Sequence, residues 1–184
     1  MGIVDKTIEF VPPLHFRTAT VDDVPVLVEL VTSAYRGEVS RRGWTTEADL
    51  LDGNRIDPDA LRHDVLRPHS QVLIAERNGN MQACAHICEQ DDAGYFGMFS
   101  VKPDLQSSGV GTAVLVEAER IVRDEWQLPR MRMNVIDVRE DIIGWYKRRG
   151  YRRTGIIKPF PYGDTRFGLP KRDDLRFEVL EKIL

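Results

Sequence analysis

The chain has 184 residues, of which 42% are hydrophobic and 30% are charged, as is typical of a soluble globular protein with one core. Its 26 basic and 29 acidic residues give a net charge of −3, which argues against a nucleic acid or an anionic membrane as a partner. No apolar run approaches the roughly 20 residues that span a bilayer. The N-terminal stretch also lacks the apolar core of a secretory signal, so we expect a cytoplasmic protein.

The first part of the chain is residues 1–13, which we expect to be a flexible lead-in that ends at a pair of prolines. Residues 14–184 are expected to form a single domain. A strand is expected over residues 14–20, and a helix follows in which Asp22 or Asp23 is the N-cap. One face of this helix carries its apolar side chains: Val24, Leu27, Val28, Val31, Ala34 and Tyr35.

Residues 40–68 are less regular, and we expect two short helices that are separated at Gly53. Thr46 and Asp49 have the spacing of a capping box, which predicts that the first of these helices starts at Thr46. An Asp57-Pro58 pair is typical of an N-cap followed by proline in the first helical position, which predicts the second start.

A β-hairpin is expected over residues 71–90, because an Asn-Gly dipeptide separates two runs of strand character. In its second strand Cys84, His86 and Cys88 alternate and therefore share one face. The outer two lie roughly 13 Å apart on a straight strand, too far to converge with the third on one tetrahedral zinc ion. We therefore expect buried thiols here and no metal site.

The second half of the chain alternates strands with helices. Strands are expected over residues 95–101, 130–138, 151–156 and 173–184, with one helix that ends near Trp126 and another that runs from Arg139 to Gly150. Acidic residues begin the latter helix and basic residues end it, which suits the helix dipole. With the strand meander in the middle of the chain, this order predicts a mixed α/β fold.

Gly109 and Gly111 lie between an expected strand and an expected helix. A glycine-rich turn at this place directs several unpaired backbone N–H groups at one point, where the helix dipole adds positive charge. The turn suits a phosphate group, because glycine lets the backbone approach closely and adopt a positive φ. Ser107, Ser108 and Thr112 add hydroxyl donors.

The glycines alone do not identify the phosphate ligand. A P-loop requires a lysine where this chain has Thr112, and a dinucleotide fingerprint requires a third glycine where it has Val114. The alternative is that Ser108 caps the helix and that the glycines only shape the turn.

Two segments together resemble the Gcn5-related N-acetyltransferase (GNAT) family. The first is the Gln-x-x-Gly-x-Gly pattern of residues 106–111, and the second is the stretch VREDIIGWYKRRGYRRTG, which begins at Val138. The resemblance covers residues 14–184. It implies a twisted mixed sheet of about seven strands with helices on both faces, in agreement with the pattern of expected elements.

The resemblance also implies which residues contact acetyl-CoA. In that family the glycine loop binds the pyrophosphate, the preceding strand pairs with the pantetheine arm and splays from the next strand, and a tyrosine lies near the thioester sulfur. The corresponding tyrosine, and the catalytic candidate, is Tyr146. The cofactor-binding candidates are Phe99, Ser100, Val101, Gln106, Ser107, Ser108, Gly109, Val110, Gly111, Thr112 and Arg139.

Three positions depart from the family pattern. Arg139 stands where many members have an asparagine, and Ile142 stands where an alanine is usual. Asn134 stands where some members carry a catalytic glutamate, so the general base is left open.

The implied reaction is direct attack of a primary amine on the thioester carbonyl, with Tyr146 as general acid toward the CoA thiolate. Candidate bases are Glu38, Glu47, Asp49 and Asp164, and candidate acceptor-site residues are Tyr35, Glu38, Trp44 and Glu47. Arg36, Arg41 and Arg42 could hold an acceptor carboxylate, or could equally lie in a solvated loop.

Two alternatives stay open at this point. The protein could be a non-catalytic acyl-CoA-binding or interaction module, for which the departures at Arg139 and Asn134 argue, or a transferase that uses a longer acyl-CoA. We expect no metal, and an acceptor that is a small-molecule or peptide amine. The late loop with Phe160, Pro161 and Tyr162 is a candidate for a homodimer contact or for a lid.

Overall fold

The computed structural model describes residues 11–184, so most of the expected lead-in, residues 1–13, lies outside the described residues. Seven strands form one mixed sheet. In spatial order they are β1 (His15–Thr18), β3 (Ser70–Arg77), β4 (Asn80–Gln90), β5 (Ala93–Val101), β6 (Arg130–Ile136), β9 (Arg176–Ile183) and β7 (Arg152–Pro159). Every neighbouring pair is antiparallel except β5 and β6, which are parallel.

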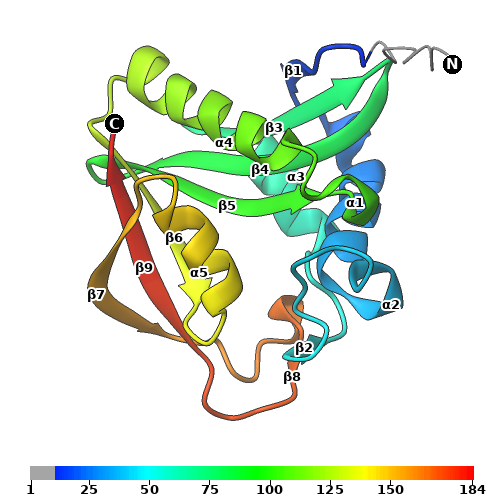
Figure 1. Ribbon diagram of the computed structural model, residues 1–184, viewed down its shortest axis with the longest axis vertical. Helices are drawn as coiled ribbons and strands as arrows, with labels where there is room; N and C mark the ends of the chain where they lie inside the picture. The colour runs from blue at the N-terminus through cyan, green and yellow to red at the C-terminus, as the bar shows by residue number, and fades with distance from the viewer. Residues whose placement is uncertain (1–10) are drawn as a thin grey trace, which may run out of the picture.

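Helices cover both faces of this sheet, as predicted (Figure 1). On one face α4 (Val110–Arg120) and α5 (Glu140–Lys147) pack with apolar residues of β3 to β6 into the larger core. On the other face α1 (Val24–Tyr35) and α3 (Pro58–Leu66) pack against β3, β4 and β5 in a second core. The predicted fold class, a twisted mixed sheet between helices, is confirmed.

The predicted hairpin and the predicted start of α3 are also confirmed. Asn78 and Gly79 both have positive φ, 49° and 73°, as the tight turn between β3 and β4 requires. The Asp57 carboxylate accepts a hydrogen bond from the backbone N–H of Ala60 at 2.9 Å, which caps α3 ahead of Pro58.

The helix predicted to start at Thr46 is wrong. The Thr46 hydroxyl contacts Ser40 at 2.6 Å and accepts from the N–H of Ala48 at 3.1 Å, so it closes a tight turn and caps no helix. The short helix of this region lies earlier, at α2 (Gly37–Ser40), and β2 (Leu51–Asp52) pairs with β8 (Leu169–Pro170). The local contacts of the Thr46 hydroxyl with Ser40 and Ala48 thus replace the helix cap that the sequence predicted.

The sheet opens between β5 and β6, because these strands pair only at Gly94–Tyr95 with Met131–Arg132. Farther along β5 the register with β4 shifts by one residue and Met98 has a φ of 50°, which marks a β-bulge. The bulge turns the end of β5 away from β6, so the splay predicted for the strand before the glycine loop is confirmed.

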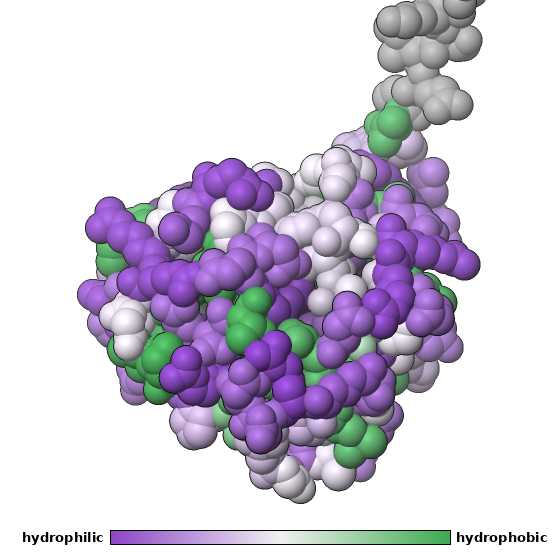
Figure 2. Space-filling view, turned by 60° about the horizontal axis from the view of Figure 1, so that its bottom comes forward, coloured by the Kyte–Doolittle hydropathy of each residue, from purple (hydrophilic) through white to green (hydrophobic). Residues whose placement is uncertain are grey.

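The late loop between β7 and β9 holds a 3-10 turn (Thr165–Phe167) and β8, neither of which the sequence predicted. Within residues 11–184 no helix is both long and apolar enough to cross a membrane. The surface seen in Figure 2 is mostly hydrophilic, and its hydrophobic areas are separated from one another.

Candidate functional site

The opening between β5 and β6 contains two cavities that share a wall at Tyr146. The larger has a volume of about 380 Å³ and extends to the glycine-rich loop. The smaller has a volume of about 80 Å³ and extends to Glu47 and Arg55. Both cavities are lined by Tyr35, Phe99, Arg139, Ile142 and Tyr146. A ligand in one cavity and a ligand in the other can therefore meet at this tyrosine.

The glycine-rich loop presents unpaired N–H groups at the mouth of the larger cavity. The Ser108 N–H reaches the Leu105 carbonyl at 3.3 Å, and within the described residues the next N–H with a backbone acceptor is that of Ala113. The N–H groups of residues 109–112 are therefore free at the N-terminus of α4. The Ser108 hydroxyl donates to the same Leu105 carbonyl, so Ser108 does not cap this helix.

Glycine stands at the two positions of the loop for different physical reasons. Gly109 is the N-cap of α4 with a φ of 88°, a conformation that favours glycine, and a Cβ there would meet no atom within 4 Å. At Gly111 a Cβ would lie 3.1 Å from the Phe99 ring and 3.4 Å from the Val101 side chain. Gly109 thus shapes the turn and keeps it open, whereas Gly111 lets α4 pack closely on β5.

A cation–aromatic pair beside this loop escaped the sequence analysis. The guanidinium carbon of Arg149 lies 3.6 Å from the ring centroid of Trp145, and its Nη2 donates to the Thr112 hydroxyl at 2.9 Å. The pair joins the end of α5 to the first turn of α4 and adds a positive charge at the loop. Because the two residues are four apart on a predicted helix, their spacing could have indicated the contact.

Tyr146 is the residue at which the two cavities meet. It is 5% exposed, and its ring packs edge-on against Trp145 and Tyr151, with centroids 5.1 Å and 5.6 Å away. Within residues 11–184 no group forms a hydrogen bond with its hydroxyl, which leaves that hydroxyl available to a ligand. Burial raises its pKa well above the ordinary value, so the phenol keeps its proton at neutral pH.

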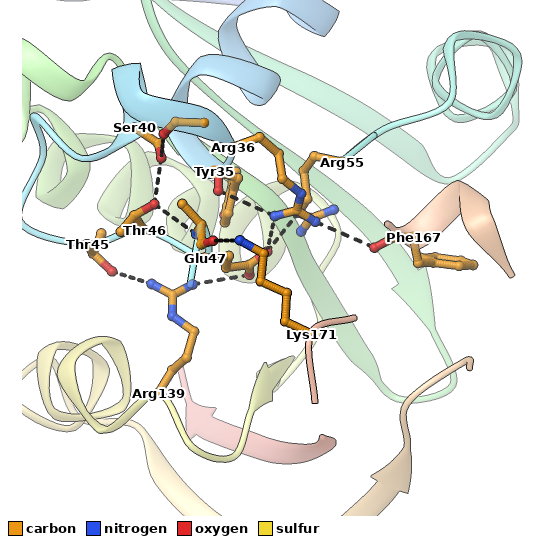
Figure 3. A network of polar contacts seen from close by, with 12 residues as sticks. Tyr35, Arg36, Ser40, Thr45, Thr46, Glu47, Arg55, Arg139, Phe167 and Lys171 are labelled. Carbon is orange, nitrogen blue, oxygen red and sulfur yellow. Dashed lines mark hydrogen bonds and ion pairs between the residues drawn. The ribbon is translucent and has the colours of Figure 1, made fainter. Parts of the chain in front are cut away.

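Glu47 is the centre of a buried cluster of three arginines (Figure 3). Its carboxylate accepts from Arg36 Nη1 at 2.8 Å and from Arg139 Nη1 at 3.1 Å, and Arg55 Nε lies 3.6 Å away. Burial favours the protonated acid, but the three guanidinium groups together hold the pKa of Glu47 below its usual range. A carboxylate stabilised in this way is a weak proton acceptor, so it fits a base poorly.

The other three carboxylates considered as bases face solvent or are paired. The side chains of Glu38 and Asp49 are 90% and 75% exposed, and both pair with Arg41. Asp164 accepts from Arg166 in the late loop, and this hydrogen bond lowers the pKa of Asp164. None of these three lines either cavity.

Most of the predicted site residues are brought together. The predicted cofactor-binding residues that line the larger cavity are Phe99, Ser100, Val101, Gln106, Ser107, Gly109, Gly111, Thr112 and Arg139. Ser108 is outside the lining, and the Val110 side chain is buried in the core. Of the acceptor-site candidates, Trp44 lines the larger cavity, Tyr35 lines both, Glu47 lines the smaller, and Glu38 lines neither.

Tyr35 also secures the wall between the cavities. Its hydroxyl donates to the Phe99 carbonyl at the β5 bulge. The guanidinium of Arg55 lies over its ring, 4.5 Å from the centroid. Arg55 comes from the irregular segment before α3, where no periodic pattern could have indicated a site residue.

The alternating Cys84, His86 and Cys88 lie away from both cavities. Both thiols are buried, as predicted, and burial raises the pKa of Cys84 to about 12. His86 contacts the Ser70 hydroxyl at 2.8 Å, and burial lowers its pKa. Across residues 11–184, no group of three or more His, Cys, Asp or Glu side chains is arranged to hold a metal ion.

Comparison with known proteins places these features in a family. A model of the acetyltransferase (GNAT) family matches residues 31–151, a span that includes the glycine-rich loop and Tyr146. No curated protein matches the sequence significantly.

Solved structures share the fold at low sequence identity. The ribosomal-protein-S18-alanine N-acetyltransferase of Escherichia coli has a TM-score of 0.67 at 15% identity, over 93% of this chain and 94% of that chain. The ribosomal-protein-alanine N-acetyltransferase of Brucella melitensis has a TM-score of 0.66 at 19% identity, over 92% and 99%. The PaiA N-acetyltransferase of Thermoplasma acidophilum, in complex with coenzyme A, has a TM-score of 0.63 at 14% identity, over 94% and 99%.

Proposed function

The chain belongs to the GNAT family of acetyltransferases, and from this premise we propose that residues 14–184 form one domain that acetylates a primary amine. The protein is an acyltransferase, and its family uses acetyl-CoA as the acyl donor. The observation that carries the proposal is the meeting of two cavities at Tyr146, one reaching an N–H-rich loop and the other a charged cluster.

The larger cavity fits acetyl-CoA. The free N–H groups of residues 109–112 suit the pyrophosphate, and Arg149 adds a cation beside them. Within residues 11–184, the β6-facing edge of β5 has no partner strand beyond Tyr95. The backbone of residues 99–101 therefore offers hydrogen-bonding groups to the amides of the pantetheine arm.

The proposed reaction needs one proton donor at the sulfur. The neutral amine nitrogen attacks the thioester carbonyl carbon, so that a C–N bond forms and the C–S bond breaks. The sulfur leaves as a thiolate and takes the phenolic proton of Tyr146. The proton lost by the nitrogen returns to the phenolate, and the products are the amide and the free CoA thiol.

The charged cluster offers a way to obtain the neutral amine without a side-chain base. An alkylammonium with a pKa of about 10.4 is only about 0.1% neutral at pH 7.4. Arg55 and Arg139 line the smaller cavity, and their positive charge disfavours an ammonium there, which lowers its pKa. We therefore assign amine deprotonation to this field and to water, and assign no carboxylate as the base.

Thiol release from acetyl-CoA over a panel of primary amines tests the proposal. We expect release that depends on the amine and saturates with it. Binding of acetyl-CoA without release for any amine would instead support a non-catalytic acyl-CoA-binding module. Faster thiol release from a longer acyl-CoA would show that this compound, and not acetyl-CoA, is the donor. The acyltransferase assignment would remain.

A further inference from the structure

We propose that the smaller cavity binds a carboxylate of the acceptor, which makes the acceptor a small amino carboxylic acid, with Arg55 as the residue that recognises it. This inference rests on the proposed function, because it takes the smaller cavity as the acceptor site. Four observations carry it: the charge balance of the cluster, the unused donors of Arg55, the occupied donors of the other arginines, and the position of the cavity.

The cluster around Glu47 has an excess of positive charge. Three guanidinium groups surround one buried carboxylate, and within residues 11–184 the only other acid that pairs with them is Asp141, which lies 3.7 Å from Arg139 and is 42% exposed. Buried charges are normally paired, because an unpaired charge in a low-dielectric site loses its hydration. An anionic ligand would restore the balance.

Arg55 has unused hydrogen-bonding capacity at the smaller cavity. Its ion pair with Glu47 is long, at 3.6 Å, and both Glu47 oxygens already accept shorter bonds from Arg36 and Arg139. Its Nε is buried and has no hydrogen-bond partner within residues 11–184. The side chain is 25% exposed, lies over the Tyr35 ring and lines the smaller cavity. Its planar group can bind a carboxylate with two parallel hydrogen bonds.

Of the arginines that the sequence suggested for this task, Arg36 and Arg41 are bonded elsewhere, and Arg42 is exposed and lines neither cavity. Arg36 is 6% exposed, and in addition to Glu47 it donates to the carbonyls of Tyr35 and Phe167 (Figure 3). Arg41 pairs with two exposed carboxylates on the surface. Arg139 donates to Thr45 as well as to Glu47. Arg36 also has a buried Nε without a partner within residues 11–184, but Arg36 lines neither cavity, so Arg55 is the member of the cluster with unused donors at the smaller cavity.

The position of the cavity sets the size of the acceptor. The smaller cavity is lined by Tyr146 and also by Tyr95, Asn134 and Phe177. With a volume of about 80 Å³ it suits a short chain that places an amine at Tyr146 and a carboxylate at Arg55. An uncharged amine of the same length would leave the guanidinium without an anion.

Matched amines with and without the carboxylate test this inference. We would measure kcat/KM for glycine and β-alanine against their amides, and divide each rate by the neutral fraction of the amine. We expect each acid to exceed its amide by at least about tenfold, as a charge-assisted bidentate contact implies. The Arg55→Gln variant should reduce this ratio to near one, because it should raise the KM of the acids. The Arg55→Lys variant should retain part of the preference.

Two controls separate recognition from folding. Arg62→Gln removes the same charge from an exposed position on α3 and should leave the ratio unchanged. Thermal stabilisation by acetyl-CoA should remain in Arg55→Gln, because Arg55 does not line the larger cavity.

Equal use of acids and amides by the unaltered protein, or an undiminished preference in Arg55→Gln, would refute the carboxylate site and leave acetyl transfer standing. If no amine gave thiol release, the proposed function itself would fail. Propionate binding to the CoA-bound protein would then decide the site, and binding that did not depend on Arg55 would overturn it.

Discussion

Tyr146 is a buried residue whose hydroxyl has no hydrogen-bond partner within residues 11–184. Here the hydroxyl borders both cavities, and its raised pKa keeps the proton on the oxygen. In the proposed reaction the protonated phenol can give its proton to a leaving thiolate, because burial also raises the pKa of that thiolate and so offsets the weaker acidity of the phenol.

Replacing Tyr146 with Phe should lower turnover by at least about tenfold, because general acid catalysis contributes about that much or more. Acetyl-CoA affinity should change little, since the ring and its packing are kept. Steady-state kinetics with a saturating amine, together with thermal shifts by acetyl-CoA, measure both quantities. In the control Tyr151→Phe, the lost hydrogen bond to Glu119 should lower stability without lowering turnover. Unaltered turnover in Tyr146→Phe would remove Tyr146 from the mechanism.

The pH dependence follows from the same pKa shift. The rate should rise with pH as the amine loses its proton, with no falling limb up to about pH 10. A falling limb would require the phenol to ionise, and burial raises the pKa of this phenol well above its ordinary value. Measurement of kcat/KM from about pH 6 to about pH 10 checks this. A decline near about pH 9 that disappears in Tyr146→Phe would contradict the shift.

Among the elements, the turn before α4 is the one that contributes backbone N–H groups to the candidate site. The αL conformation of Gly109 lets the chain enter α4 with the N–H groups of residues 109–112 left free at the larger cavity. A non-glycine residue in this conformation is strained by about 1–2 kcal/mol.

Gly109→Ala should therefore weaken acetyl-CoA binding as well as the fold, because the strain distorts the anion-binding turn. Gly79→Ala is the matched control: Gly79 has a φ of 73°, its Cβ would also meet open space, and it lies in the β3–β4 turn. Both variants should lose about 1 kcal/mol of unfolding free energy. Only Gly109→Ala should lose affinity, by at least about tenfold in calorimetric titration. Equal affinities would show that the turn is structural.

The junction of β1 with α1 depends on one carboxylate. Asp23 accepts two hydrogen bonds from Arg17 at 2.8 Å and one from the Thr20 N–H at 2.8 Å. The bonds from Arg17, and then that from Thr20, lower the pKa of Asp23 to about 2 despite the opposing effect of burial. The stability gained is therefore fully present above about pH 4 and is lost as the pH falls through about 2.

Asp23→Asn should lower the unfolding free energy by about 1–2 kcal/mol at neutral pH, as expected for a partly buried bidentate pair. The difference from the unaltered protein should shrink as the pH falls from about 5 to about 2. Urea unfolding at several pH values measures this. The exposed neighbour Asp22 provides the control, and Asp22→Asn should be neutral. A difference that stayed constant with pH would exclude the ion pair as its cause.

At the scale of the whole molecule, binding of a ligand in the larger cavity is linked to the stability of the fold. The larger cavity takes its wall from β5, α4, α5 and the segment around Trp44, so a ligand there holds together parts that lie far apart in the chain. Acetyl-CoA at a hundred times its Kd should add about 2.7 kcal/mol of stability. Thermal unfolding against a titration shows this, and adenosine diphosphate should stabilise less because it lacks the pantetheine arm. Equal shifts would restrict the site to the phosphate loop.

The amino-acid sequence by itself determined most of the elements and one half of the site. Local patterns are sufficient for the Asn-Gly hairpin, the capped start of α3 and the helix that ends before Gly150, because each depends on neighbours in the chain. The glycine-rich turn is local as well, so its N–H groups and its phosphate chemistry could be predicted from residues 106–112.

Only the tertiary structure shows which residues surround the smaller cavity, which we propose as the acceptor site. Glu47 seemed a free carboxylate in the sequence, but the fold brings Arg36, Arg55 and Arg139 to it from three separate segments. A turn that the Thr46 hydroxyl closes stands in place of the helix predicted at Thr46, and β8 of the late loop pairs with β2. Charge pairing between distant residues carries no periodic signal, so only the folded chain shows that Arg55 makes the longest of the three ion pairs with Glu47 and lines the smaller cavity.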